Sequence, residues 1–472
     1  MREARRWDPN GDGMGSSPRG RARRRAALVA YLQMAPAAEV IDACRRCEDG
    51  GAEEDGGAES TSPSPFGDAA QDALHRCVTH PIATSHPPDR KYVARLLKLA
   101  TLEAERSGRE LSDRVGDLVT RTFTRCDGAD EEAGWCHKTY VYRHPTSDAE
   151  RRPDRDDVND DDDDDDIRDA PSVSFRMHRN MFEGGTGCHE WHAAIYLAEL
   201  ALTHPKLFEH RRVVELGSGC GVAATVMARG GANCRVRGGW GPVGAPSRLV
   251  LTDADAGALA NLERNLAAND VRVERYQSND ESNEPSNDES NDDDVRACSV
   301  RTARLNWEDL EAGDYFGRGG SRPRVDLVVA SDVLYDPLNV TPLLNTCERI
   351  LGDVDGDGES APPGTVPGDG EWAPRPWHED AISRPSAIFV TTLRQPETLA
   401  LFERVAAERG FEPRDVTAEV FGAIGATGLF EDVRGLDRRE MRVHELRPPP
   451  RGWGKGGEGR DGLNRDGGST SY

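Results

Sequence analysis

The chain has 472 residues, a formal net charge of −24 and 10 cysteines. This length is enough for two or more domains. No stretch of about 18 apolar residues occurs, so we expect no membrane span. Cysteines at this frequency without a secretory signal fit a reducing compartment.

Most of the excess negative charge lies in three stretches, at residues 154–169, 278–294 and 352–373. They are rich in Asp, Asn, Ser, Gly or Pro and hold few apolar residues, so they cannot bury enough surface to offset the entropy cost of ordering. We expect three disordered insertions, the last one lying within residues 352–385. Because the remainder is near neutral, the net charge argues against neither nucleic acid nor protein as a partner.

The first 135 residues predict a disordered start and then a small helical accessory module. Residues 1–27 are polar and basic, and we expect them to be disordered. Within the module, at residues 28–135, apolar side chains recur at helical spacing between Tyr92 and Leu102. Cys44 and Cys47 form one C-x-x-C pair, but no second pair follows at zinc spacing, so we expect no metal site.

Residues 136–180 predict a β-hairpin. Its two arms, residues 138–142 and 173–177, alternate polar and apolar side chains as paired strands do, and the first acidic stretch lies at its tip.

Strand and helix patterns alternate from residue 181 to residue 446, and a Gly- and Arg-rich stretch at 447–472 is expected to be a disordered tail. Five repeats of strand and helix indicate an α/β domain with a doubly wound, mainly parallel, Rossmann-like sheet. In such a sheet the ligand lies at the carboxyl ends of the strands, near the topological switch. The predicted strands cover residues 212–216, 249–251, 300–305, 325–330 and 387–392, with further extended stretches near 415–421 and 440–446.

The most informative motif follows the first of these strands. Three glycines alternate at Gly217, Gly219 and Gly221, with Glu215 before them. A dinucleotide fingerprint requires a third glycine at the position that Val222 holds here. The E-x-G-x-G-x-G spacing therefore differs from that fingerprint, and a tight strand-to-helix turn is the alternative interpretation.

Two further strand ends carry side chains suited to a nucleoside. Asp253 can accept both ribose hydroxyls, although it lies farther from the glycines than the usual gap of about 20 residues; the excess fits in a loop at residues 235–247. A helix cap is the alternative role for this aspartate. Trp307 offers a flat apolar wall for an adenine ring, with packing in the core as the alternative.

The fourth strand ends in Ser331 and Asp332, with Tyr335 three residues later. An amine that enters here as a nucleophile must be neutral, and a lysine side chain has a reference pKa of about 10.4. Asp332 can attract and align the ammonium, and Tyr335 can donate a hydrogen bond or present its ring face. The alternative is that Asp332 caps the next helix and Tyr335 packs.

Together these motifs resemble the seven-β-strand protein methyltransferases with a D-x-x-Y motif, and within them the eukaryotic elongation factor 2 lysine methyltransferases. The segments at residues 184–194 and 392–402 are similar to that family as well. The resemblance implies S-adenosylmethionine as cofactor, Asp332 and Tyr335 beside the acceptor lysine, and a cytoplasmic location. It implies cofactor-binding roles for Trp191, Glu215, Gly217, Ser218, Gly219, Asp253, Trp307 and Ser331.

The leading hypothesis is a protein-lysine methyltransferase that acts on elongation factor 2. Alternatives are a methyltransferase for another protein or a small molecule, and a cofactor-binding adaptor without turnover. The helical module favours a macromolecular substrate, because a small substrate needs no docking module. We expect no nucleic-acid substrate, because the Asn-Pro-Pro-Tyr motif of base methyltransferases is absent at residues 331–334.

Overall fold

The computed structural model of the chain describes a set of separate ranges. Residues 1–17, the first two acidic stretches, most of the third and residues 449–472 lie outside them, so the predictions of disorder there stay predictions. The described residues fall into two compact units, which are treated one at a time. The described ranges are 18–48, 64–124, 134–143, 170–180, 185–230, 244–274, 298–308, 325–352, 377–382 and 384–448.

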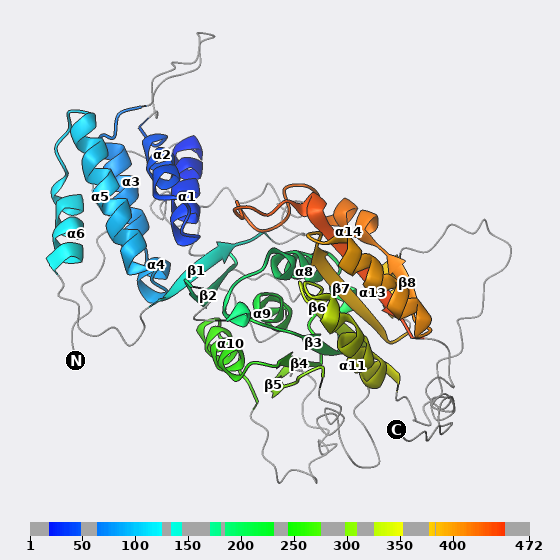
Figure 1. The fold of residues 1–472 in the computed structure, drawn as a ribbon. Helices are drawn as coiled ribbons and strands as arrows, with labels where there is room; N and C mark the ends of the chain where they lie inside the picture. The colour runs from blue at the N-terminus through cyan, green and yellow to red at the C-terminus, as the bar shows by residue number, and fades with distance from the viewer. Residues whose placement is uncertain are drawn as a thin grey trace, which may run out of the picture. The chain divides into compact units, whose positions relative to one another are not determined.

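The first unit contains the predicted helical module and the hairpin (Figure 1). The hairpin strands pair antiparallel, with Lys138 opposite Phe175, close to the predicted positions. Its elements are α1 Pro18–Leu32, α2 Ala37–Arg45, α3 Asp68–Thr79, α4 Pro81–Ser85, α5 Arg90–Arg106, α6 Asp113–Thr124, β1 Trp135–Val141, β2 Ser172–His178 and the short helix η1 Thr186–Cys188.

Helix α1 begins at Pro18, so the expectation of disorder up to residue 27 is wrong for its last ten residues. Proline suits the first helical position because its φ angle is already helical and its missing N–H has no partner there. Apart from Gly20, the next two turns consist of arginine and alanine, which have high helix propensity. The buried residues from Ala27 to Leu32 anchor the helix in the core, and the exposed turns extend back from them.

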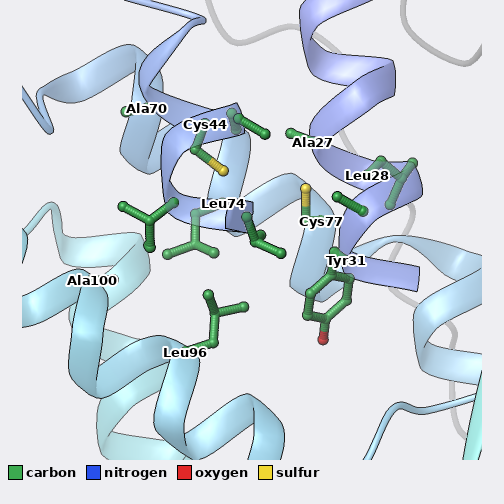
Figure 2. Close-up of a cluster of buried hydrophobic side chains, with 14 of the residues drawn as sticks. Ala27, Leu28, Tyr31, Cys44, Ala70, Leu74, Cys77, Leu96 and Ala100 are labelled. Atoms are coloured by element: carbon green, nitrogen blue, oxygen red, sulfur yellow. The ribbon is translucent and has the colours of Figure 1, made fainter. Parts of the chain in front are cut away.

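Apolar side chains mainly from α1, α2, α3 and α5 form the core of this unit, with smaller contributions from α4, α6 and β1 (Figure 2). Side chains three or four positions apart lie on one face of a helix, which is why each of the four main helices contributes two or more of them. The labelled side chains are Ala27, Leu28 and Tyr31 from α1, Cys44 from α2, Ala70, Leu74 and Cys77 from α3, and Leu96 and Ala100 from α5.

A late segment of the chain, Thr427–Leu436, also belongs to the first unit. Arg25 on α1 donates from Nε and Nη2 to the Glu431 carboxylate, at 3.0 and 2.7 Å. The Glu431 N–H donates to the Val141 carbonyl at 2.9 Å. Phe430 is 1% exposed, and its ring centroid lies 5.1 Å from that of Tyr142. This segment is therefore tied by backbone, charge and packing to residues far earlier in the chain.

The second unit is built on a seven-stranded sheet with the order β5-β4-β3-β6-β7-β9-β8 (Figure 1). The first five strands in this order are parallel, and β9 runs antiparallel to β7 and β8. The predicted α/β, doubly wound fold is thus confirmed. The strands are β3 Arg212–Leu216, β4 Arg248–Asp253, β5 Ser299–Arg304, β6 Leu327–Ser331, β7 Ser386–Thr392, β8 Glu412–Asp415 and β9 Met441–Arg447.

Helices cover both faces of this sheet. Alternate strand residues such as Leu216 and Phe389 pack against α11 and α13 in one hydrophobic cluster. Residues of the opposite parity face the other side, where α8 contacts β7 and α9 contacts β4. The helices are α8 His192–Thr203, α9 Val222–Arg229, α10 Ala256–Ala268, α11 Val340–Gly352, α12 Trp377–Ile382, α13 Pro396–Glu408 and α14 Thr417–Ile424, with short helices η2 Pro205–Leu207, η4 Pro337–Asn339 and η5 Arg438–Glu440.

Two expectations about this unit are wrong. Residues 377–382 form α12 inside the range that we expected to be disordered, because Trp377 is buried and holds a turn against the core. Residues 417–424 form α14, whereas an extended stretch was expected to continue to 421. Asp415 accepts the Thr417 N–H and starts the turn. No helix in the described part of the chain is long and apolar enough to cross a membrane.

Candidate active site

Strand β3 has a neighbour on each side, β4 and β6, at which the direction of winding reverses. This is the topological switch, where ligands bind at the carboxyl ends of the strands. The turn after β3 has φ angles of 68° at Gly217 and 79° at Gly221, in the left-handed region that favours glycine. A Cβ on Gly221 would lie 2.1 Å from Cδ1 of Leu262 on α10. The turn therefore needs glycine both for its backbone angle and for the close approach of α10.

The end of β4 holds this turn in place. Ser218 N–H donates to the Thr252 carbonyl at 2.8 Å, and Thr252 N–H donates to Ser218 Oγ at 3.1 Å. Gly219 N–H donates to Asp253 Oδ2 at 3.1 Å. Burial raises the pKa of Asp253. The predicted glycine turn and the predicted ribose-binding acid are thus in direct contact.

Asp253 is not the cap of the following helix. The N-cap of α10 is Asp255, whose Oδ1 accepts the Ala258 N–H at 2.6 Å. Of the two roles considered for Asp253, the capping role therefore belongs to its neighbour.

Glu215 lies beneath the turn and is 1% exposed. Burial raises its pKa to about 8; a hydrogen bond with Ser218 lowers it and the charge of Asp253 raises it further. Oε2 has no hydrogen-bond partner among the described residues. A buried polar atom without a partner costs free energy, and a positively charged amino group of a ligand on this turn would supply one. The residues present therefore fit the amino acid part of the expected cofactor.

Trp307 follows β5 and is partly buried against the core cluster. Its ring lies 3.5 Å from where a Cβ on Gly217 would be. The tryptophan thus both packs on the core and presents its edge beside the turn, so the two interpretations of this residue are compatible. Ser331, at the end of β6, is partly buried.

Asp332 lies just beyond β6 with a φ angle of 52°, and its side chain is 2% exposed. The two carboxylate oxygens are bound by the end of β7. Oδ1 accepts the Thr392 N–H at 2.8 Å. Oδ2 accepts from Thr392 Oγ1 at 3.1 Å and from Arg394 Nη2 at 3.0 Å. The predicted acceptor-aligning acid is therefore anchored on the neighbouring strand.

The alternative roles for the D-x-x-Y motif were that Asp332 caps the next helix and that Tyr335 packs in the core, and the structure shows neither. The short helix η4 is capped by Asp336, which accepts the Leu338 N–H at 2.9 Å, and not by Asp332. Tyr335 is 53% exposed and does not pack in the core. Partial burial raises the pKa of Tyr335, and the charges of Asp253 and Asp336 add to this. The phenol of Tyr335 is therefore a neutral hydroxyl that is open to solvent. The negative charge of Asp253, at the end of β4, contributes to keeping it protonated.

Two residues that the motif analysis did not assign to the site complete it. These are Thr392 and Arg394, which follow β7. The Arg394 guanidinium carbon also lies 5.0 Å from the ring centroid of Trp191, at the N-cap position of α8. The sequence alone could have indicated these two residues in part, because polar residues that follow parallel strands lie at the same edge of the sheet. The pairing of β6 with β7 was not predicted.

A separate cavity of about 450 Å³ borders this edge. It is lined by Phe421, Arg439 and Arg442 among others, and by none of the predicted site residues. It lies next to the end of β7, because the Leu393 N–H donates to the carbonyl of Glu440 in η5 at 2.9 Å. The cavity therefore adjoins the acceptor side of the edge and not the glycine turn.

Part of the chain is similar in sequence to known lysine methyltransferases. Residues 170–355 match the family described as lysine methyltransferase. The chain is 26% identical over 279 residues to the protein-lysine N-methyltransferase EEF2KMT of Bos taurus, covering 59% of this chain and 67% of that one. It is 24% identical over 349 residues to the Homo sapiens EEF2KMT, covering 73% and 79%.

Among solved structures, the chain matches the ribosomal protein L11 methylase of Lactobacillus delbrueckii subsp. bulgaricus, with 14% identity, a TM-score of 0.26, and coverage of 54% of this chain and 77% of that one. The sheet order is that of a Rossmann-like fold, and the sequence matches are to lysine methyltransferases. The resemblance to the lysine methyltransferase family, and within it to the elongation factor 2 lysine methyltransferases, is confirmed. The matched region spans about two thirds of the length of the Bos taurus relative.

Proposed function

We propose that this protein is an S-adenosylmethionine-dependent protein-lysine N-methyltransferase whose substrate is elongation factor 2 in the cytoplasm. The observation that supports it most is the adjacency of two half-sites on neighbouring strands. The glycine turn after β3, with Glu215 and Asp253, is suited to a cationic nucleoside. Asp332 and Tyr335, after the neighbouring β6, are suited to an amine.

When bound, S-adenosylmethionine would supply an activated methyl group on a positively charged sulfur. The lysine ammonium would first lose one proton to solvent. The neutral nitrogen could then take the methyl group, with sulfur keeping the electron pair of the broken carbon–sulfur bond, and the product would be a methylated ammonium. Glu215, Asp253 and Trp307 would hold the amino group, ribose and adenine, while Asp332 and Tyr335 would orient the acceptor. Positioning of this kind supplies a large part of the rate without a dedicated base.

The substrate is inferred from the two EEF2KMT relatives, whose names state a protein-lysine N-methyltransferase. Incubation of the purified protein with tritiated S-adenosylmethionine and purified elongation factor 2, or with a cell lysate, tests it. A labelled band of elongation factor 2 size supports the proposal. If only other proteins or small molecules were labelled, elongation factor 2 would not be the substrate. If nothing were labelled although the cofactor still bound, the protein would be a cofactor-binding adaptor without turnover.

A pair of variants tests the acceptor side. Asp332→Asn keeps the shape of the side chain but removes its charge, and we expect turnover to fall about 100-fold, because orientation of the acceptor is lost. Binding of S-adenosylhomocysteine, measured by calorimetry, should change by less than about threefold. The matched control is Asp336→Asn on the same loop, which should keep turnover within about threefold. Equal turnover of the two variants would contradict the role of Asp332.

A further inference from the structure

The Asp332 carboxylate has little room for another partner. A carboxylate offers about four lone-pair sites, and Thr392 and Arg394 occupy three of them. Both sites on Oδ2 are taken, while Oδ1 accepts only the Thr392 N–H. One site, on Oδ1, accepts no hydrogen bond from the described residues, but the side chain is 2% exposed. Asp332 therefore acts on an incoming amine as part of its ion pair with Arg394 and not as a bare carboxylate.

Arg394 joins the two halves of the site. Its side chain is 44% exposed, whereas that of its partner Asp332 is 2% exposed. The guanidinium also lies 5.0 Å from the ring centroid of Trp191, within the range of a cation–π contact. The arginine is thus held between the acceptor acid and a tryptophan that the resemblance assigns to the cofactor.

The charge of Arg394 bears on the state of the acceptor. A lone carboxylate beside a lysine favours the ammonium form, which has no lone pair to attack with. A guanidinium on the same carboxylate offsets that effect, because it is positive at every working pH. We propose that Arg394 is a positioning residue that fixes Asp332 and keeps the incoming amine in its neutral, reactive form.

Other charged groups at this edge lie on η5 and β9, where Arg439 and Arg442 line the cavity that adjoins the acceptor side. Asp253 and Asp336 act on Tyr335. Glu440, in η5, contributes its backbone carbonyl to Leu393. Among the described residues, Arg394 is the cation that is hydrogen-bonded to Asp332, so its removal changes the local charge by a full unit.

The test rests on the proposed function and uses the dependence of kcat on pH, because kcat reports the ionisation of groups in the enzyme–substrate complex. The acceptor is elongation factor 2 or, where that is not labelled, the lysate protein that the wild-type enzyme labels most strongly. Replacing Arg394 by Gln should raise the acceptor pKa by about one unit. The expected result is an approximately tenfold loss at about pH 7.5 that shrinks to less than about twofold near pH 10. Arg394→Lys keeps the charge and should follow the wild-type profile within about threefold.

Two controls separate this role from a structural one. Arg409→Gln breaks an ion pair of the same length, 3.0 Å, to Glu348 away from the strand ends, and should leave the pH profile unchanged. Binding of S-adenosylhomocysteine to all variants should stay within about threefold of wild type, which also reports that they fold. Three results would each overturn the proposal. They are a loss of turnover in Arg394→Gln that is equal at every pH, no loss of turnover in Arg394→Gln, and the same loss in Arg394→Lys as in Arg394→Gln. The wild-type rate reports on the proposed function, and the difference between profiles reports on Arg394.

Discussion

Glu215 shows how one buried residue can couple cofactor binding to pH. Its carboxyl group is 1% exposed, burial raises its pKa to about 8, and Oε2 has no partner among the described residues. At neutral pH the free protein therefore holds a proton here. A cationic amino group favours the charged form, so binding of the cofactor should release that proton.

This coupling predicts a direction for affinity. Between about pH 6 and pH 7.5 the affinity for S-adenosylhomocysteine should rise by up to about tenfold per pH unit. The reason is that the fraction of protein molecules whose Glu215 must be deprotonated on binding falls as the pH rises. Glu215→Gln should bind about tenfold more weakly and lose this dependence. Calorimetry in buffers of different ionisation enthalpy would measure the released proton. The control is Glu263→Gln on the exposed face of α10, and a wild-type affinity independent of pH would contradict the prediction.

The same proton affects stability in the free protein. The folded-state pKa of Glu215 is raised above that of the unfolded chain. Its contribution to the free energy of unfolding is therefore fully present below about pH 4.5 and is lost as the pH rises through about 8. Thermal melts of the wild type and Glu215→Gln should accordingly differ more at pH 8 than at pH 5, the glutamine variant being relatively more stable at the higher pH.

At the scale of elements, the absence of a side chain in the β3–α9 turn allows α10 to pack closely against that turn. Gly221 has a φ angle of 79°, and a Cβ there would lie 2.1 Å from Leu262 Cδ1. We expect Gly221→Ala to lower the free energy of unfolding by about 3 kcal/mol and to weaken S-adenosylhomocysteine binding, because backbone strain and a clash act together.

Gly116 provides the matched control for this prediction. It lies within α6, with nothing within 4 Å of an added Cβ. Gly116→Ala should therefore stabilise the protein by about 0.5–1 kcal/mol through helix propensity. Denaturant unfolding of both variants measures the two changes. Equal changes of the same sign would contradict the interpretation of the turn.

Periodicity predicted the elements of the second unit more closely than it predicted their order. Strand β3 covers the predicted residues 212–216, and β7 at Ser386–Thr392 covers the predicted residues 387–392. These patterns are local, so the sequence contains them directly. The pairing of β6 with β7, which brings Thr392 and Arg394 to Asp332, depends on contacts between residues about 60 positions apart. Local spacing carries no information about such contacts.

At the scale of the whole molecule, the two units do not correspond to two consecutive pieces of chain. Segment Thr427–Leu436 belongs to the first unit, whereas the residues on both sides of it belong to the second. Domain boundaries read from the sequence assume consecutive pieces, and this assumption misses a return of the chain. The boundaries that we expected at residues 135, 180 and 446 stay predictions.

The returning segment predicts a stability effect at a distance in sequence. Phe430→Ala should lower the free energy of unfolding of the first unit by about 3–5 kcal/mol, because it empties a fully buried site. The control is Phe123→Ala on α6, 56% exposed in the same unit, which should change it by less than about 0.5 kcal/mol. Scanning calorimetry measures both. A loss for Phe430→Ala no larger than that for Phe123→Ala would contradict the assigned packing.

The return of the chain also bears on cleavage. A protease that cuts between residues 180 and 185 severs the backbone, yet the later fragment still carries Glu431 and Phe430, which are held by the earlier one. Such a nicked protein should elute from a sizing column as one species, and the two fragments should separate only when the first unit unfolds.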